Sequence, residues 1–402
     1  MALMKILFLT STLPRFPGDM QANFVAEQAE AWLAARPFDE ITVLAPHDSG
    51  APRKERHGNL CIERFPYMLR ERWQRLAYPA ILPNIRRNPA LVLQVPFFLW
   101  GEYRAASQVV RGFNPHLIYA HWVMPQGVVA WQLKRKLGIP YILQNHSSDL
   151  SAFLKLGGFG RKIAKDVLKS AEHFFCVNAY QRDFALDFFD DDVQRAEFSK
   201  RCTVLPMGIG GNFFSSTKKE KNGFEIATIA RLSRKKGLNY LLEAAERLAD
   251  RGVMPSIGIA GDGEDRAELQ AMVSKANVTF TGFLNGREKE HFLASAQRFI
   301  FPARSSDGDV EGMPVALLEA LCRGCPVLAS KDTNIELLPE WPSICETVAL
   351  VPDPTNIEAL EKAIERLLGA DQEKSREAAK LMSRYRWDCL IQEYLSVIEK
   401  VA

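Results

Sequence analysis

The chain has 402 residues, of which 47% are hydrophobic and 25% are charged, so it can form two or three domains of an ordinary soluble globular protein. Its formal net charge of +3 is too small to predict nucleic acid binding. Its seven cysteines are scattered, which favours reduced cytosolic thiols over a disulfide framework.

The N-terminal stretch, residues 1–16, contains an apolar run but lacks the small-residue cleavage site of a signal peptide. This run is short, and no uninterrupted apolar run of transmembrane length follows it. We therefore interpret the stretch as a buried strand and expect the protein to be cytoplasmic.

Strands and helices alternate through the first half, which predicts a parallel α/β sheet. The expected strands are residues 5–10, 41–45, 60–65, 117–120, 141–145, 173–177 and 202–205. Amphipathic helices are expected at residues 22–35 and 125–137, and residues 66–112 are predicted to be irregular and helical.

The pattern restarts after the glycine-rich segment 206–212, which is the natural hinge. Further strands are expected at residues 224–229, 256–260, 278–281, 298–301, 327–329 and 348–350, with helices that include 238–250 and 263–276. This second doubly wound unit predicts two Rossmann-like domains that face a cleft. The expected domains are residues 1–206 and 207–385, with a helix at about 386–402 that packs back on the first.

Residues 307–330, DGDVEGMPVALLEALCRGCPVLAS, are predicted to form a loop, a helix, a turn and a strand. Pro314 suits the first helical position, where no backbone N–H is needed. The amides near Met313 and Val315 would lie at the helix N-terminus, and such an end attracts phosphate.

Two acids belong to this apolar stretch. Glu311 precedes the helix and Glu319 lies inside it. Carboxylates beside an anion site can accept hydrogen bonds from the hydroxyls of a sugar or a ribose. The stretch therefore predicts a site for a sugar on a nucleoside diphosphate, although a capped helix with solvated acids would have the same pattern.

Arg231 and Lys236 follow the first strand of the second half. Two cations in that loop would neutralise the charge that develops on a leaving diphosphate. The alternative is a solvated basic turn, and this is the interpretation we give to Lys235.

Gly261 and Gly263 follow the next strand, but Arg266 occupies the position of the third glycine in a dinucleotide fingerprint. NAD binding is therefore disfavoured, and the two glycines are expected to let the backbone turn close to a ligand. Phe283 and Leu284 follow the strand after that and could flank a base or belong to an ordinary loop.

In the first half, His121 and His146 end neighbouring predicted strands, and Asp149 follows three residues after the second histidine. Two histidines at strand ends on one cleft favour a functional site. No Ser-His-Asp order or carboxylate-rich metal cluster stands out in the sequence.

Residues 67–112 combine arginines with aromatic side chains typical of membrane interfaces. The segment includes Arg70, Arg72, Arg75, Arg86, Arg87, Trp73, Tyr78, Phe97, Phe98 and Trp100. This composition predicts a surface that lies on anionic lipid. The alternative is that residues 91–100 pack in the core while the arginines are solvated.

Four motifs in order resemble the retaining nucleotide-sugar glycosyltransferases of the GT-B fold, in the group of glycosyltransferase family 4. EGMPVALLEALCRGCPVLAS resembles the family's E-x7-E signature, and ARLSRKKGLNYLLEA resembles its GR-x-x-x-x-KG segment with an alanine for the glycine. VLPMGIGGNFF and NHSSDL are similar to the interdomain and turn motifs. The first loop departs from the pattern, because Gly18 is its single glycine.

The resemblance implies a role for each matching residue. Glu311 would contact the donor sugar and Glu319 the ribose, while Arg231 and Lys236 would bind the diphosphate. His121 would lie near the transferred sugar. The implied reaction retains the anomeric configuration, uses a UDP- or GDP-linked donor and requires no metal or other cofactor.

The resemblance also implies a class of product. The form DGDVEGMP is similar to enzymes that build bacterial exopolysaccharide and lipopolysaccharide, so a glycan or lipid-linked glycan is the expected acceptor. The alternatives are a GT-B-like epimerase or phosphorylase and a non-catalytic nucleotide-sugar-binding module. The intact carboxylates and cations argue against the last.

Overall fold

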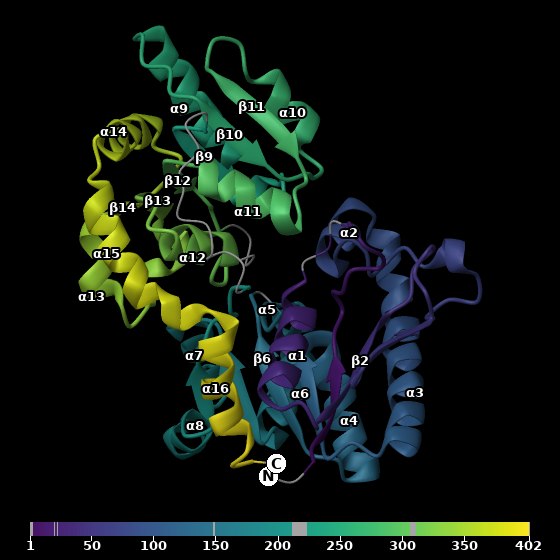
Figure 1. The fold of residues 1–402 in the computed structure, drawn as a ribbon. Coiled ribbons are helices and arrows are strands. Elements are labelled where there is room, and N and C mark those ends of the chain that lie inside the picture. The colour runs from purple at the N-terminus through teal and green to yellow at the C-terminus, as the bar shows by residue number, and fades with distance from the viewer. Residues whose placement is uncertain are drawn as a thin grey trace. The chain divides into compact units, whose positions relative to one another are not determined.

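The computed structural model describes residues 3–19, 21, 23–147, 149–210, 223–305 and 311–401. The acidic loop 307–309 and hinge residues 211 and 212 lie outside them. The chain divides into two units, unit 1 (Met1–Pro206 and Leu390–Ala402) and unit 2 (Met207–Cys389). Each unit contains one sheet with helices on both faces (Figure 1).

The sheet of unit 1 has the strand order β3-β4-β2-β1-β5-β6-β7-β8. Its strands are β1 (Lys5–Leu9), β2 (Glu40–Pro46), β3 (Lys54–His57), β4 (Leu60–Phe65), β5 (Leu117–His121), β6 (Tyr141–Asn145), β7 (His173–Cys176) and β8 (Cys202–Val204). Every neighbouring pair is parallel except β3 and β4, which form an antiparallel hairpin at the edge. The carboxyl ends of β5 and β6 therefore lie side by side.

Side chains of successive strand residues alternate between the two faces of this sheet. Leu7 and Leu9 belong to the core that α3 (Val95–Phe113), α4 (Val128–Leu137) and α6 (Gly157–Ser170) cover. On the other face, Phe8 packs against Trp32 of α1 (Phe24–Ala35). The shorter helices of the unit are α5 (Ser151–Leu154), α7 (Ala179–Leu186) and α8 (Asp192–Ser199).

A helical excursion links β4 to α3. It contains the short turns η1 (Glu71–Trp73) and η2 (Pro89–Gln94) and the helix α2 (Ile81–Arg87) between them. Phe98 of α3 is buried and meets Phe65 and Tyr67, with ring centroids 5.2 and 5.3 Å away. These contacts fix the start of α3 on the sheet.

Unit 2 has the strand order β11-β10-β9-β12-β13-β14, with every described pair parallel. The strands are β9 (Ile226–Ile229), β10 (Ile257–Ala260), β11 (Val278–Gly282), β12 (Arg298–Phe301), β13 (Val327–Ser330) and β14 (Val348–Val351). The order reverses beside β9, so the loops after β9 and β12 leave the sheet at a topological switch point.

Helices cover both faces of this second sheet. The main ones are α9 (Leu238–Asp250), α10 (Arg266–Ala271), α11 (Gly286–Ser295), α12 (Val315–Cys322), α13 (Trp341–Ile344), α14 (Ile357–Leu368) and α15 (Gln372–Met382). Leucines of α9 and aliphatic residues of α14 share one core with β9, β10 and β12. On the other side, the Cys322 thiol of α12 donates to the Met382 carbonyl of α15 at 3.0 Å.

The last helix, α16 (Trp387–Ile398, yellow in Figure 1), belongs to unit 1 from Leu390 onward. The buried Tyr394 hydroxyl donates to the carbonyls of Leu205 and Pro206 at 3.0 and 3.1 Å. Its ring lies 4.9 Å from that of Phe175 on β7. The C-terminal residues thus complete the core that β7 and β8 begin.

The predicted two-sheet α/β architecture is confirmed, and most strands lie within two residues of their expected bounds. Two local predictions were wrong. β3 was not anticipated, because four charged or polar residues give no apolar alternation. The helix expected at residues 263–276 is shorter, since α10 spans only Arg266–Ala271.

Candidate active site

The loop before α12 holds Glu311 in a nearly buried position, with 8% of the residue exposed. Its backbone N–H donates to Ser305 Oγ at 3.4 Å, and its carbonyl accepts from Asn334 Nδ2 at 3.2 Å. The Ser305 N–H in turn donates to Asp332 Oδ2 at 2.7 Å. Segments after β12 and β13 therefore fix the Glu311 backbone before any ligand arrives.

The Glu311 carboxylate is paired with lysines of the loop after β9. Lys236 Nζ donates to both carboxylate oxygens at 2.8 and 3.0 Å, and Lys235 Nζ lies 3.6 Å from one of them. The two lysine side chains are 18% and 19% exposed. The expectation that Lys235 is merely solvated was therefore wrong, because a run of cations does not reveal which of its members turn inward.

Gly237 explains how Lys236 reaches this carboxylate. Its φ of +66° lies in the left-handed region, and a Cβ there would approach the Pro302 carbonyl oxygen to 1.9 Å. The Arg304 N–H also donates to the Lys235 carbonyl at 2.8 Å. The loop after β9 thus packs backbone to backbone against the loop after β12, which leads to Glu311.

Glu319 lies on α12, 2% exposed, and accepts from Lys289 Nζ of α11 at 2.7 Å. Its second oxygen, Oε2, is buried without a hydrogen-bond partner among the described residues. A buried acceptor without a partner is costly, so this oxygen is suited to a ligand hydroxyl. Sequence reasoning missed Lys289, because a lysine on an amphipathic surface helix carries no local signal of a partner thirty residues away.

Pro314 is the residue that precedes α12, one position earlier than expected, with an extended ψ of 118°. Met313 and Pro314 are buried and Val315 begins the helix. The predicted N-terminal amides therefore belong to the turn that follows Glu311. Their contact with phosphate stays a prediction.

Arg231 also follows β9, but its guanidinium contacts Glu264 rather than Glu311. Nε and Nη2 lie 3.1 and 3.0 Å from Glu264 Oε2. Among the described contacts, Lys236 joins Glu311 and Arg231 does not. The two cations therefore occupy different parts of the same loop.

Gly261 and Gly263 allow the loop after β10 to lie against the loop after β9. A Cβ at Gly261, whose φ is +137°, would come within 1.8 Å of the Ala230 carbonyl oxygen. A Cβ at Gly263 would come within 2.2 Å of the Leu232 carbonyl oxygen. The chain's own backbone thus accounts for both glycines. Half-buried Phe283 and Leu284 follow β11, and their contact with a base stays a prediction.

In unit 1, His121 and His146 meet at the carboxyl ends of β5 and β6. His121 Nδ1 lies 3.1 Å from His146 Nε2, and the rings are stacked at 17°. Burial, with a smaller effect of His146, lowers the pKa of His121 well below its ordinary value, and burial lowers the pKa of His146 to about 3. Both imidazoles are therefore neutral at physiological pH, with one ring donating to the other.

His121 Nε2 is buried without a hydrogen-bond partner in the described part of the chain. The ring is stacked on Tyr119, with centroids 4.6 Å apart. Trp122 follows with a φ of +77°, an uncommon backbone conformation for a bulky residue, and its ring lies 4.5 Å from that of His146. Such a conformation is typical of functional turns.

Asp149 organises this turn rather than facing outward. Oδ2 accepts from the Val123 N–H at 2.7 Å, and Oδ1 accepts from Asn145 Nδ2 at 2.6 Å and from the Ser147 N–H at 3.3 Å. Burial raises the pKa of Asp149 to about 6, although these donors oppose the increase. Whether Asp149 also contacts a donor stays a prediction.

Behind the histidines, α3 contributes a buried carboxyl group that the sequence did not reveal. Glu102 is fully buried, and burial raises its pKa to about 8, an increase that a hydrogen bond with Gln126 opposes. The Gln126 amide, oriented to satisfy its neighbours, donates to the His121 carbonyl at 3.1 Å and accepts from the Ser11 N–H at 3.2 Å. Gln126 thus links the turn after β5 to the loop after β1.

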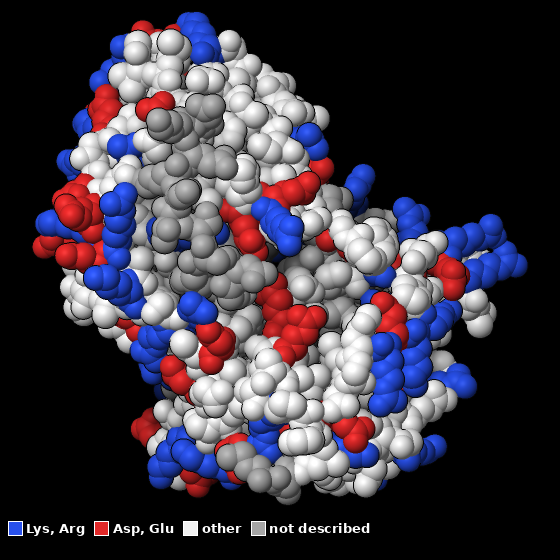
Figure 2. Space-filling model, viewed as in Figure 1, with Lys and Arg blue, Asp and Glu red and all other residues white. Residues whose placement is uncertain are grey.

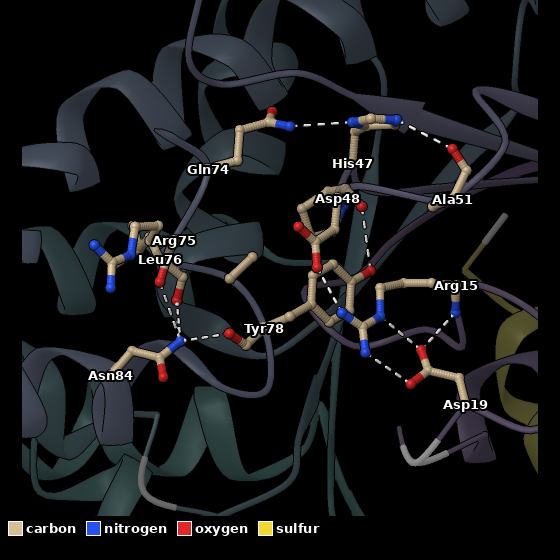
Figure 3. Close-up of polar contacts among 12 residues, drawn as sticks. Arg15, Asp19, His47, Asp48, Ala51, Gln74, Arg75, Leu76, Tyr78 and Asn84 are labelled. Atoms are coloured by element: carbon tan, nitrogen blue, oxygen red, sulfur yellow. Dashed lines mark hydrogen bonds and ion pairs between the residues drawn. The ribbon is translucent and has the colours of Figure 1, made fainter. Parts of the chain in front are cut away.

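The loop after β1 contains Gly18, at a φ of +83°, and is fixed by Arg15 (Figure 3). Arg15 donates to both oxygens of Asp19 at 2.8 Å and to Asp48 after β2 at 2.5 Å. Its guanidinium lies 4.9 Å from the ring centroid of Tyr78. Arg15 was not predicted, because its partners come from three separate segments of the chain.

The described residues contain no group of three or more His, Cys, Asp or Glu side chains that could hold a metal ion. The cysteines among them are free thiols. No helix within the described ranges is long and apolar enough to cross a membrane.

Comparison with known proteins identifies the family. The family model "Glycosyl transferase 4-like domain" matches residues 21–197, and "Glycosyl transferases group 1" matches residues 211–382. The putative colanic acid biosynthesis glycosyltransferase WcaL of Salmonella typhimurium is 32% identical over 369 residues, which cover 84% of this chain and 85% of that protein. The chain therefore belongs to glycosyltransferase family 4, a family of retaining enzymes.

Two further relatives extend the comparison. The putative teichuronic acid biosynthesis glycosyltransferase TuaC of Bacillus subtilis is 28% identical over 386 residues, 90% of this chain and 89% of that protein. The structure of Anabaena HepE in complex with UDP-glucose matches with a TM-score of 0.66 at 16% identity, covering 99% of this chain and 100% of that one. The fold is GT-B, as the motifs predicted.

Proposed function

We propose that this glycosyltransferase moves a sugar from a nucleoside diphosphate to a glycan or lipid-linked glycan, in the synthesis of a bacterial surface polysaccharide. The names of the colanic acid and teichuronic acid relatives support this class of product. The UDP-glucose complex of HepE supports a UDP-linked donor, and a GDP-linked donor is the alternative.

The observation that carries the proposal is a pair of nearly buried carboxylates, one in the turn before α12 and one within α12. Each is paired with a lysine. Glu311 is paired with Lys236 and Glu319 with Lys289. A nucleotide-sugar presents matching groups: hydroxyls for the carboxylates and phosphates for the cations. The vacant hydrogen-bonding capacity of Glu319 Oε2 fits a ribose hydroxyl.

In the proposed reaction, an acceptor hydroxyl attacks the anomeric carbon from the face that the diphosphate leaves. The bond from this carbon to the phosphate oxygen breaks, the new glycosidic bond forms, and the departing phosphate takes the acceptor proton. Lys236 and Arg231 would offset the charge on the diphosphate while Glu311 orients the sugar. Neutral His121 would offer Nε2 to a sugar hydroxyl.

Within this proposal, residues 207–385 bind the donor and residues 1–206 bind the acceptor, with the C-terminal helix as part of the latter. We also propose a cytoplasmic location at the inner face of the membrane, where a lipid-linked acceptor would be reached. The other predicted donor contacts are Met313, Pro314, Val315, Gly18, Gly261, Gly263, Phe283, Leu284, His146 and Asp149.

A donor screen tests this function. Purified protein is heated with UDP- and GDP-sugars, and we expect one sugar nucleotide to raise the melting temperature and Glu319→Gln to reduce that increase. The matched control is Glu197→Gln, a substitution of an exposed glutamate on α8. If no nucleotide or nucleotide-sugar binds, the proposed donor site is wrong.

The role of the acceptor distinguishes transfer from related chemistry. With the bound donor identified, we expect release of the nucleoside diphosphate to depend on added lipid-linked or oligosaccharide acceptor. Conversion of the donor sugar without any acceptor would indicate an epimerase. Turnover that needs inorganic phosphate would indicate a phosphorylase.

A further inference from the structure

One surface of unit 1 exposes large apolar side chains together with arginines. Leu69 is 97% exposed, Leu93 71%, Phe97 55%, Trp100 61% and Trp73 42%. These five side chains, with the exposed arginines of residues 70–104, are called the arginine–aromatic surface below. Scattered apolar residues are normal on a protein, but a cluster of this kind indicates a binding partner.

The backbone beneath this surface is fixed. Gln94 Nε2 donates to the Trp73 carbonyl at 2.9 Å, so the turn that carries Trp73 lies beside the segment that leads into α3. Asn84 Nδ2 donates to the carbonyls of Leu76 and Tyr78 at 3.0 and 2.8 Å (Figure 3). The exposed side chains therefore project from an ordered scaffold.

The spacing places the apolar residues on one stripe. Phe97, Trp100 and Arg104 are separated by three and four residues, which aligns them along one face of α3, and Leu93 lies in the preceding turn η2. The residue between two of them, Phe98, is buried instead. The alternative that residues 91–100 pack in the core therefore holds for Leu91 and Phe98, which are buried, but not for the exposed Leu93, Phe97 and Trp100.

The charge of residues 67–112 is mainly positive, although exposed Glu71 lies among the arginines. Residues 67–112 contain seven arginines and two glutamates, and one of these glutamates, Glu102, is fully buried. The Arg70 and Arg104 guanidinium groups lie 5.2 and 5.4 Å from the rings of Trp73 and Trp100. Figure 2 shows basic side chains gathered on the side of unit 1 where α3 lies, at the right of the view.

We propose that the arginine–aromatic surface binds the anionic surface of a lipid bilayer. Tryptophan and phenylalanine would enter the headgroup boundary, and arginines beside their rings would reach the lipid phosphates. A groove for nucleic acid would not expose Leu69 and Leu93, which have no polar group to offer a phosphate backbone. Attachment would be peripheral and reversible.

Docking would also orient the unit. Tyr78 belongs to the same fixed excursion, its hydroxyl donates to the Pro46 carbonyl at 3.1 Å, and its ring lies against Arg15. Arg15 in turn holds the loop after β1. A membrane that binds the arginine–aromatic surface would therefore bind a face that is rigidly connected to the loops after β1 and β2.

Vesicle co-sedimentation tests this proposal without donor or acceptor, so its result is independent of turnover. The full chain is mixed with phosphatidylcholine vesicles that contain phosphatidylglycerol, or with phosphatidylcholine alone. We expect binding to the anionic vesicles only, and salt should weaken it. Phe97→Ser/Trp100→Ser and Arg86→Glu/Arg87→Glu should each weaken partitioning by at least about tenfold.

Matched controls are present in the same unit. Phe159→Ser, at a residue 71% exposed on α6, is the control for the aromatic change. Arg135→Glu/Lys136→Glu, at the end of α4, is the control for the charge reversal. Both controls should bind as the wild type does. Equal losses in the control variants, or wild-type protein that stays in the supernatant at low salt, would overturn the proposal. Concentration-dependent dimerisation lost in Phe97→Ser/Trp100→Ser would assign the surface to a second copy of the chain instead.

Discussion

The polar groups at the ends of β5 and β6 in unit 1 and those of Glu311 and Glu319 in unit 2 are held by opposite means. At the ends of β5 and β6, two neutral histidines share one hydrogen bond and burial suppresses their charge. In unit 2, Glu311 before α12 and Glu319 within α12 each form an ion pair with a lysine. The histidine pair of unit 1 offers hydrogen bonds from buried, uncharged rings. The site of unit 2 offers carboxylates whose charge is balanced by lysines.

Under the proposed function, this difference would suit the two sites to different groups of the ligand. A neutral imidazole can exchange a directional hydrogen bond with a hydroxyl, a carboxylate can accept one, and an oriented lysine suits a diphosphate. Lys236 is oriented by Glu311 and by backbone packing at Gly237, while His121 is oriented by His146 and Tyr119. The predictions below alter one side of this comparison at a time.

The largest effect is expected where backbone packing orients a lysine. Gly237→Ala should destabilise unit 2 by more than about 3 kcal/mol, because the new Cβ would meet the Pro302 carbonyl at 1.9 Å. Gly252→Ala is the control, with a similar φ of +81° but open space around it, and should cost about 1 kcal/mol. Urea unfolding measures both, and equal costs would show that packing of the two loops is not the constraint.

Removal of one cation is the next largest effect. We expect Lys236→Ala to lower kcat/KM by about 100-fold, because it removes charge from the leaving diphosphate and leaves Glu311 with the more distant Lys235. Lys235→Ala should cost less than about tenfold. Steady-state kinetics with the identified donor would measure both, and identical constants would contradict the assignment of Lys236.

The two carboxylates should separate binding from turnover. Glu319→Ala should raise the donor Kd by about tenfold, since a ribose contact is made equally in the ground and transition states. Glu311→Ala should mainly lower kcat, by roughly 30-fold, because its sugar contact changes along the reaction. Isothermal titration and initial rates distinguish the two, and wild-type values in both variants would remove Glu311 and Glu319 from the site.

The smallest effect concerns the uncharged side of the comparison. The pKa of Glu102 is raised to about 8, so between about pH 4.5 and pH 8 the unfolded chain ionises this group while the folded chain keeps it protonated. Stability is thus lost as pH rises through that window. Glu102→Gln should be more stable than the wild type at about pH 5.5, one pH unit above 4.5, by at most about 1.4 kcal/mol, and equal to it near pH 4.

Urea unfolding at the two pH values checks this, with Glu197→Gln on the exposed face of α8 as the control. A Glu102→Gln variant whose advantage is the same at both pH values would show that Glu102 does not titrate in this window. The histidine pair should have the opposite effect on the pH dependence of stability. Because the pKa values of His121 and His146 are lowered in the folded state, the unfolded chain gains protons first, and stability is lost as pH falls below about 6.5.

Much of this architecture could be predicted because strand periodicity and chain alternation are local properties. The spacing of Glu311 and Glu319 and the order of the motifs also survive in a single sequence. Contacts between residues far apart in the chain cannot be predicted from such local patterns. Lys289 reaches Glu319 from another helix, and Arg15 joins residues of three segments, so no local pattern indicated either.

Residues that work through the backbone were also hard to anticipate. Gly261 and Gly263 were predicted to let the backbone turn close to a ligand, which stays a prediction, and the sequence did not reveal that the carbonyls of Ala230 and Leu232 occupy the space that a side chain would fill. Lys235 and Lys236 are adjacent and chemically identical, and the folded loop presents each of them differently to Glu311. A one-dimensional pattern reports the presence of such groups but not their direction.

The helix α16 has a consequence for how the protein is made. Tyr394, whose hydroxyl donates to the carbonyls of Leu205 and Pro206, is translated 188 residues after Pro206, although both belong to unit 1. At a usual rate of about 5–20 residues per second, the ribosome needs roughly 10–40 s between these two points. During that interval the face of β7 at Phe175 lacks its contact with Tyr394, so unit 1 cannot complete its packing until α16 has been made.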